Sequence, residues 1–305
     1  MAINEQDIAN IVRNVLKGME TETPAAKKTA AAPKLNGIFE TPEEAIAAAK
    51  AAQKEIQPMP LEFREKIIAN IRKKTLENAK MLSELAVEET GMGNVGHKII
   101  KHQLVAEKTP GTEDLTTIAW SGDRGLTLTE MGPWGVIGAV CPSTNPTCTV
   151  ICNSIGMLAA GNAVVFMPHP SAKNCSNLAI DMVNRASIEV GGPANIVTAV
   201  ADPTMEVSNY IFKHKDVDML VATGGPGVVT AVLSSGKRAM GAGAGNPPVL
   251  VDETANIPKA AEDIINGCTF DNNLPCIAEK EVVAVDMIAD ELIYHMEQAG
   301  CYHAS

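Results

Sequence analysis

A cysteine near the carboxyl end of the sequence stands in a setting that suits a nucleophile. Cys276 directly follows Pro275, in the polar, turn-forming stretch 270–275 rather than in an apolar run. A free thiol is only a few per cent thiolate at pH 7, yet it is intrinsically a strong nucleophile. The sequence therefore offers Cys276 for attack on an electrophilic carbon. The alternative is a buried structural thiol, because free cysteines are among the most buried residues of proteins.

An asparagine amide is the second group that could do chemistry. Asn145 lies between Pro142 and Pro146, in the segment 141–147 that follows an apolar, β-rich run. The two prolines restrict the backbone and present a rigid amide donor, which an oxyanion hole requires. The same side chain could instead form an Asx-type turn.

Glycines and a histidine offer further contacts for a ligand. Residues 223–227 read Thr-Gly-Gly-Pro-Gly between a β-rich run and a helical stretch, where backbone N–H groups can approach a phosphate or a nicotinamide. The segment lacks the last glycine of the G-x-G-x-x-G fingerprint, so it is a weak signal alone. A second glycine cluster at 241–248 also permits close backbone approach. His169, flanked by prolines, is either a structural surface residue or a functional one.

Alternating elements must position these groups. Short β-rich runs are predicted at 135–140, 163–166, 196–200, 219–222 and 249–251. Helical stretches are predicted between them at 150–160, 177–190 and 205–212. This alternation predicts an α/β fold, a Rossmann-like doubly wound parallel sheet covered by helices on both faces. In such a fold ligands bind beyond the carboxyl ends of the strands, where the candidate residues fall.

The chain before this alternation contains three further kinds of segment. Residues 1–18 predict an amphipathic helix, and the Thr-, Ala-, Pro- and Lys-rich stretch that follows predicts a flexible linker. This helix either docks onto a partner or packs on its own domain. Residues 41–90 predict helices, starting at the favourable sequence Thr-Pro-Glu-Glu, and 126–131 alternate like a strand.

Composition excludes several function classes. Lys+Arg 25 against Asp+Glu 36 gives a net charge of −11, and 3% aromatic residues provide few base-stacking platforms, so nucleic acid is not an expected partner. No apolar run approaches the ~18 residues that span a membrane. Seven scattered cysteines indicate thiols in a reduced, cytoplasmic protein, and their spacing, without a C-x-x-C pair, predicts no metal site.

Read together, the motifs resemble the aldehyde dehydrogenase superfamily. The resemblance is closest to its CoA-acylating branch from bacterial microcompartments, the propionaldehyde and acetaldehyde dehydrogenases of propanediol and ethanolamine utilisation. The segments that carry it are 89–93, 109–111, 135–137, 142–147, 161–163, 168–170, 223–225, 241–248 with 251–254, and 270–280.

The resemblance implies a mechanism and a set of site residues. It implies that Cys276 attacks the aldehyde and that the Asn145 amide and the Cys276 backbone N–H hold the oxyanion. It further implies that NAD accepts the hydride and that coenzyme A removes the acyl group. The residues implied to bind the cofactor are Ser143, Thr144, Pro168, His169, Thr223, Gly224 and Gly225.

One departure from the wider superfamily bears on the reaction. Hydrolytic members carry a glutamate in the segment corresponding to 241–248, where it activates water, and here that segment has no carboxylate. The expected function is therefore NAD-dependent oxidation of a short-chain aldehyde to acyl-CoA rather than to free acid. The stretch 267–280 slightly favours propanal over acetaldehyde.

The resemblance also predicts domains and partners. It assigns 1–18 to an encapsulation peptide that binds a microcompartment shell protein, 19–37 to a linker, 38–253 to an NAD-binding domain and 254–305 to the beginning of a second α/β catalytic domain. Relatives continue beyond residue 305, so we expect a homo-oligomer for the longer form and weak or no catalysis by this chain. Two alternatives stay open: a hydrolytic aldehyde dehydrogenase, and a non-catalytic fragment that binds a shell.

Overall fold

The computed structural model describes residues 35–243, 245 and 247–304. The helix predicted over 1–18 and the linker up to residue 34 lie outside the described residues. The helices are α2 (Pro42–Ile56), α3 (Leu61–Thr90), α4 (Val95–Lys108), α5 (Pro146–Ala159), α6 (Lys173–Glu189), α7 (Met205–Lys213), α8 (Pro226–Leu233), α9 (Ile257–Thr269) and α10 (Asp286–Gln298). The strands are β1 (Ile38–Phe39), β2 (Ile118–Gly122), β3 (Gly125–Thr129), β4 (Val136–Val140), β5 (Ala163–Met167), β6 (Val197–Val200), β7 (Met219–Thr223), β8 (Arg238–Ala242), β9 (Pro248–Val251) and β10 (Glu281–Ala284).

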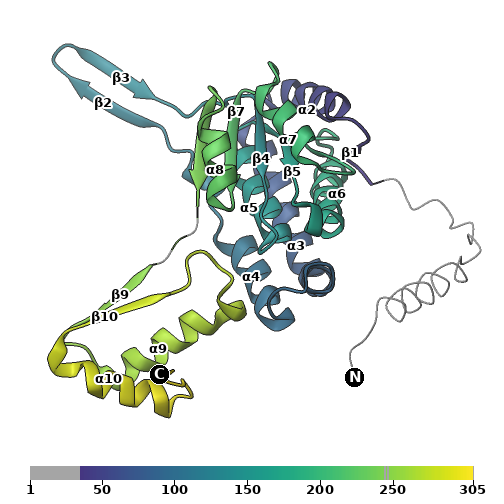
Figure 1. Cartoon of the computed structure of the whole chain (residues 1–305). Helices are drawn as coiled ribbons and strands as arrows, with labels where there is room; N and C mark the ends of the chain where they lie inside the picture. The colour runs from purple at the N-terminus through teal and green to yellow at the C-terminus, as the bar shows by residue number, and fades with distance from the viewer. Residues whose placement is uncertain (1–34, 244, 246, 305) are drawn as a thin grey trace, which may run out of the picture. The chain divides into compact units, whose positions relative to one another are not determined.

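A six-stranded parallel sheet forms the centre of the described chain (Figure 1). Its strand order is β1-β6-β5-β4-β7-β8, and every neighbouring pair is parallel. The chain proceeds from β4 to β5 and β6 on one side, then returns to place β7 and β8 on the other. The order therefore reverses between β4 and β7, which is the point where open α/β sheets bind ligands.

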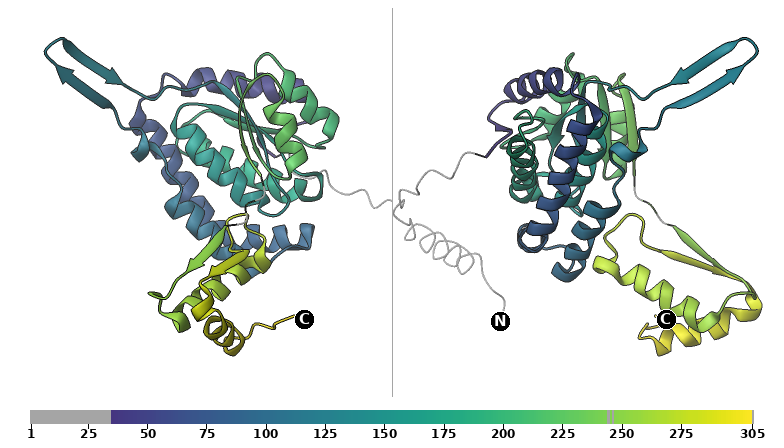
Figure 2. Two further views of the ribbon diagram at one scale, coloured as in Figure 1. Left: turned by 60° about the vertical axis from the view of Figure 1, so that its left-hand side comes forward. Right: turned by 180° about the vertical axis from the view of Figure 1, so that it is seen from behind.

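Helices cover both faces of this sheet, as the turned views show (Figure 2), and an apolar cluster lies between the helices and the sheet on each face. In β5 the buried residues alternate: Val164 and Phe166 join the layer of α3, α5 and α6, while Val165 joins the layer of α2, α7 and α8. This alternation follows from the two-residue repeat of a strand. The predicted doubly wound fold is confirmed.

The central helices begin earlier than predicted. α5 starts at Pro146 rather than Val150, and α6 starts at Lys173 rather than Asn177. Proline suits the first turn of a helix, where its missing N–H group has no intrahelical partner to lose. The predicted start at Thr41 is confirmed, because its side chain and Glu44 form a reciprocal capping box at α2.

Two strands behave differently from the prediction. The run at 249–251 is a strand, but β9 pairs with β10 in a separate two-stranded parallel sheet, so the expectation that it extends the central alternation is wrong. The central sheet ends instead on β8, which has no β-branched residue and is largely exposed. Such an edge strand carries little of the pattern by which strands are recognised.

The predicted strand near 126–131 belongs to a hairpin. β3 pairs antiparallel with β2, and all ten residues of the two strands are exposed, including Trp120, Leu126 and Leu128. In the described residues, no helix is both long and apolar enough to cross a bilayer.

Candidate active site

A cavity of about 520 Å³ lies at the carboxyl ends of β4 and β7. It brings together residues from five segments that are far apart in the sequence. Eight of the nine predicted site residues line it: Ser143, Thr144, Asn145, His169, Thr223, Gly224, Gly225 and Cys276. The ninth, Pro168, lines an adjoining cavity of about 80 Å³ together with His169, Met205 and Phe212.

Cys276 is the one exposed cysteine of the seven, all of which lie in the described part of the chain. Burial raises the pKa of Cys148 to about 11 and that of Cys175 to about 12, so these two thiols stay protonated at neutral pH. Cys141 is also fully buried. Exposure therefore distinguishes Cys276 from the thiols of the core, as a nucleophile requires.

A run of left-handed residues leads to this thiol. Asp271, Asn272 and Asn273 have φ of 49°, 56° and 59°, a region that Asn and Asp tolerate better than other non-glycine residues. On the other side Gly245 approaches so closely that a Cβ there would lie 2.2 Å from the carbonyl oxygen of Cys276. The glycine cluster predicted to permit close backbone approach thus makes that approach to Cys276.

Asn145 occupies the N-cap position of α5, but its side chain does not cap the helix. Its Oδ1 accepts a hydrogen bond from Lys101 Nζ, and its Nδ2 donates to Thr144 Oγ1 at 3.2 Å. Because an ammonium group can only donate, Lys101 fixes which end of the amide carries the oxygen. Among the described residues, no hydrogen bond from a backbone N–H to the Asn145 side chain supports the Asx-turn alternative.

A buried charged cluster, formed by Lys98, Lys101 and Asp271, lies beside Asn145. Asp271 Oδ2 accepts from both ammonium groups, and Oδ1 accepts from the Asn94 backbone N–H at 2.8 Å. Burial by itself would raise the pKa of Asp271, but the hydrogen bonds from Lys101 and Asn94 and the two positive charges outweigh it and lower that pKa. Burial and the charge of Lys101 lower the pKa of Lys98.

No sequence pattern predicted this buried charged cluster. Lys98 and Lys101 lie three residues apart on α4, so they share a helix face, but their partner Asp271 is about 170 residues away. Spacing could have shown the shared face; it could not have shown that the face is buried.

A neutral histidine supports the same region. His102 is fully buried, and burial lowers its pKa to about 4. Its Nδ1 lies 2.8 Å from the Lys98 carbonyl oxygen, so Nδ1 carries the proton, and its Nε2 accepts from Thr147 Oγ1 at 2.9 Å. The bond from Nε2 joins α4 to the first turn of α5, which begins directly after Asn145.

The glycines after β7 leave room for a ligand. In the described part of the chain, a Cβ at either Gly224 or Gly225 would meet no atom within 4 Å. Gly225 is the N-cap of α8, so the first N–H groups of that helix lie beside the cavity. His169 caps a 3₁₀ turn through Nδ1, which accepts from the Ser171 N–H at 3.2 Å.

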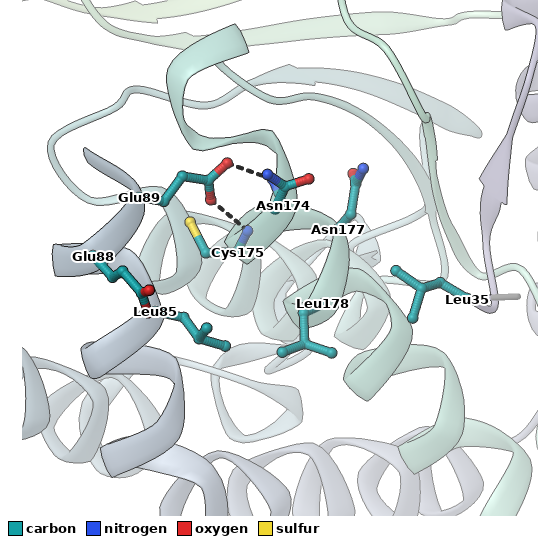
Figure 3. A pocket seen from close by; sticks show the side chains of 8 residues that line it. All are labelled: Leu35, Leu85, Glu88, Glu89, Asn174, Cys175, Asn177 and Leu178. Atoms are coloured by element: carbon teal, nitrogen blue, oxygen red, sulfur yellow. Dashed lines mark hydrogen bonds between the residues drawn. The ribbon is translucent and has the colours of Figure 1, made fainter. Parts of the chain in front are cut away.

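A second large cavity lies away from these residues, between α3 and α6 (Figure 3). Glu89 points into it and accepts from the backbone N–H groups of Asn174 and Cys175 at 2.8 and 2.7 Å. The carboxylate thereby supplies partners for the first turn of α6, which has no side-chain cap of its own. This geometry gives Glu89 a structural role.

The fold and the cavity define a class: an α/β protein with a cavity at the switch point of its sheet and an accessible thiol in that cavity. The sequence pattern of the aldehyde dehydrogenase family matches residues 13–300. The chain belongs to the aldehyde dehydrogenase family.

Comparisons within the family confirm the resemblance to its acylating branch. The chain is 50% identical to acetaldehyde dehydrogenase (acetylating) of Bilophila wadsworthia, over 100% of the chain and 64% of that protein. It is 66% identical, with a TM-score of 0.86, to the solved propionaldehyde dehydrogenase from the Clostridium phytofermentans fucose utilisation bacterial microcompartment, over 88% of the chain and 62% of that structure. The chain thus spans less than two thirds of the length of these relatives.

Two further solved structures contain ligands. Rhodopseudomonas palustris propionaldehyde dehydrogenase, with bound CoA and an acylated cysteine, is 55% identical with a TM-score of 0.85, over 88% of the chain and 62% of that structure. An engineered glycolyl-CoA reductase with bound NADP⁺ is 53% identical with a TM-score of 0.85, over 89% of the chain and 62% of that structure. Relatives of this chain therefore bind CoA and a nicotinamide nucleotide.

Proposed function

We propose that the protein oxidises a short-chain aldehyde to acyl-CoA through a thioester on Cys276. The observation that carries this proposal is the shared cavity, in which an exposed thiol and a polarised asparagine amide lie beside the open glycines after β7. The acylated cysteine and bound CoA of the R. palustris relative support it.

Each side chain has a distinct part in the proposed reaction. The Cys276 thiolate attacks the aldehyde carbon and forms a hemithioacetal. The Asn145 Nδ2 and the Cys276 backbone N–H donate hydrogen bonds to its oxyanion, where one such donor contributes about 3–4 kcal/mol to lowering the barrier. The space at Gly224 and Gly225 and the N-terminus of α8 fit a nicotinamide nucleotide, which supplies the hydride acceptor when bound. The sulfur of CoA then attacks the thioester, and Cys276 leaves as the thiolate.

The chemistry of the cavity favours CoA over water as the acyl acceptor. In the described part of the chain no Asp or Glu lines the cavity, and residues 241–248 contain none. Without a carboxylate to deprotonate water, a thioester persists until a thiol arrives. Hydrolytic aldehyde oxidation is therefore the less favoured function.

An assay of NADH formation with and without CoA tests the proposal. We expect weak aldehyde-dependent NADH formation that requires CoA, with acyl-CoA as the product in mass spectrometry. Fast release of free acid in the absence of CoA would refute acyl transfer. The absence of any aldehyde-dependent reduction, in a chain that still binds the nucleotide, would favour a non-catalytic role.

The substrate and the nucleotide are narrower proposals. We infer a preference for propanal over acetaldehyde, with NAD as the hydride acceptor. The propionaldehyde dehydrogenase relatives support the first, while the B. wadsworthia relative acts on acetaldehyde. Values of kcat/KM for each aldehyde with each nucleotide decide both.

The proposed location is the interior of a bacterial microcompartment, reached through binding of residues 1–18 to a shell protein. The microcompartment origin of the C. phytofermentans relative supports it. Deleting residues 1–18 should abolish co-purification with shell proteins and leave the melting temperature nearly unchanged. We also propose a homo-oligomer. The β2–β3 hairpin supports this proposal, because it exposes large apolar side chains that a second copy could cover.

A further inference from the structure

Helix α4 reverses the usual pattern of a surface helix. It buries Lys98 and Lys101, which are 2% and 8% exposed, while Ile100 and Leu104 are 51% and 53% exposed. A helix normally turns its apolar stripe inward and its lysines outward. Ala106 and Val105 of α4 do pack on the core, but apolar packing does not explain why Lys98 and Lys101 are buried while Ile100 and Leu104 are exposed. That reason lies in what the lysines contact.

The contacts of the two lysines form two parallel bridges. Lys101 Nζ donates to both Asp271 and the Asn145 Oδ1, and Lys98 Nζ donates to Asp271 and to the Thr144 carbonyl oxygen, both at 3.2 Å. Each bridge thus joins the turn that leads to Cys276 with the loop that carries Asn145. These two segments hold the nucleophile and the oxyanion donor of the proposed reaction.

The loop before α4 is shaped for the same carboxylate. Gly93 has a φ of 81°, and a Cβ there would lie 2.3 Å from Asp271 Oδ1. The backbone N–H of Asp271 donates to His97 Nδ1 at 2.8 Å, and Phe270 stacks on that imidazole with ring centroids 4.7 Å apart. The turn is therefore held from several sides, with Asp271 at the centre of the contacts.

Stability alone is a poor explanation of this buried charged cluster. Removing charges from water costs free energy that the ion pairs only partly return, and well-packed apolar side chains of similar volume are often as stabilising. What apolar side chains cannot do is donate to an amide oxygen. Two ammonium groups against one carboxylate also leave a net positive charge beside Asn145, which polarises its amide.

We propose that Lys101, with Lys98 and anchored by Asp271, is a positioning residue for the Asn145 amide. Lys101 holds Oδ1 away from the cavity, so that Nδ2 presents its N–H to the oxyanion formed at Cys276. This inference rests on the function proposed above and adds to it the group that orients the donor.

The proposal distinguishes two reactions of the same thiol. With p-nitrophenyl acetate, the Cys276 thiolate attacks the carbonyl carbon, an oxyanion forms, and the C–O bond breaks to release p-nitrophenolate and leave an acetyl thioester. With iodoacetamide, the sulfur displaces iodide from a saturated carbon and no oxyanion forms. In both reactions the thiol proton goes to solvent. Only the acylation needs the oriented amide.

The experiment measures both rates at Cys276 by peptide mass spectrometry on the full chain. We expect Lys101→Met to slow acylation at least tenfold and to change alkylation less than twofold. Asn145→Ala should slow acylation by about 10²–10³, and adding Lys101→Met to it should cause little further loss. Lys101→Gln, which keeps an N–H donor, should lose less than Lys101→Met and serves as the second variant if the first folds poorly.

Asp181→Asn is the matched control. Asp181 is 3% exposed, pairs with Arg185 at 2.6 Å on α6 and does not line the cavity, so its loss removes a buried carboxylate elsewhere. We expect both rates to be unchanged in this variant. An unchanged acylation rate in Lys101→Met, or an equal fall of both rates, would overturn the positioning role while leaving the proposed function intact. A wild-type thiol that is alkylated but never acylated would overturn both.

Discussion

The two ends of the central sheet each place an asparagine at the end of a strand, with opposite results. At the amino end, the Asn162 Oδ1 accepts from the backbone N–H groups of Trp134 and Gly135 at 2.7 and 3.0 Å, and its Nδ2 donates to the Met157 carbonyl oxygen. At the carboxyl end, Lys101 holds the Asn145 Oδ1, and among the described residues Nδ2 contacts only the Thr144 hydroxyl. The Asn162 amide joins backbone segments, whereas the Asn145 amide keeps an N–H that is available for the proposed oxyanion.

Charged groups differ between the two ends in the same way. At the amino end, Asp218 accepts from the Val136 N–H at 2.8 Å and pairs with Lys50 at 3.5 Å, and both side chains are about one third exposed. At the carboxyl end, Asp271 is fully buried and binds two lysines. The two ends of the sheet therefore differ in the partners of their polar side chains rather than in the residue types. These partners suit a structural role at the amino end and the proposed chemistry at the carboxyl end.

The largest expected effect at the carboxyl end is the loss of the thiol. Cys276→Ser should lower the burst of p-nitrophenolate from p-nitrophenyl acetate at least about 10⁴-fold, because nucleophile removal typically has effects of this size. Cys148→Ser, which replaces a buried thiol with a raised pKa, should retain most of the burst. A normal burst in Cys276→Ser would show that Cys276 is not the nucleophile and would contradict the chemical role proposed for the carboxyl end of the sheet.

Replacing each asparagine in turn compares the two ends directly. Asn145→Ala should slow acylation of Cys276 by p-nitrophenyl acetate by about 10²–10³, or about 3–4 kcal/mol of barrier, because it removes one oxyanion donor. Its free energy of unfolding should fall by only about 1 kcal/mol, because Asn145 does not cap α5 and Lys101 keeps Asp271 as a partner. Acylation rates and urea titrations measure the two quantities. A large fall in stability with an unchanged rate would make Asn145 structural, like Asn162.

Acid should weaken the carboxyl end through His102. Its pKa is lowered by burial from 6.5 to about 4, so the unfolded chain binds this proton before the folded one does. The related stability is complete above pH 6.5 and is lost as the pH falls toward 4, by about 3 kcal/mol at most. Urea titrations across this range should show the loss in the wild type and a smaller loss in His102→Gln. The control is His303→Gln, at an exposed histidine, which should keep the wild-type pH profile. If His102→Gln also kept the wild-type profile, the loss of stability could not be assigned to His102.

The smallest effect is expected at the amino end. Asn162→Ala should lower the free energy of unfolding by about 1–3 kcal/mol, because it leaves the N–H groups of Trp134 and Gly135 without their acceptor. The acylation rate per folded molecule should stay within about twofold of the wild type. A selective loss of acylation in this variant would show that the two ends are coupled.

Much of the fold followed from short-range sequence signals. The buried strands β4 to β7 are apolar runs bounded by turn residues, and such runs show their positions directly. The edge strand β8 lacks β-branched residues, and the pairing of β9 with β10 depends on a segment about thirty residues later. Local sequence patterns therefore could predict neither strand β8 nor the pairing of β9 with β10.

The candidate site divides in the same way. Asn145, Gly224 and Cys276 could be selected from the residues around them, and the structure brings them to one cavity; their roles stay predictions. Lys101 looks like an ordinary helix lysine because its burial is set by Asp271, which reaches it only in the folded chain. Long-range partners decide this part of the site.

The left-handed turn at 271–273 also limits how this protein can vary. Three successive residues with positive φ admit Gly, Asn and Asp readily and most other side chains only with strain, and at Asp271 the two lysines require a carboxylate as well. A random library across these positions, selected for soluble expression alone, should therefore return a narrow alphabet at 272 and 273. Enrichment of Gly, Asn and Asp at 272 and 273 would reflect the left-handed backbone alone. Enrichment at 271 would also reflect the need for a negative charge beside the two lysines.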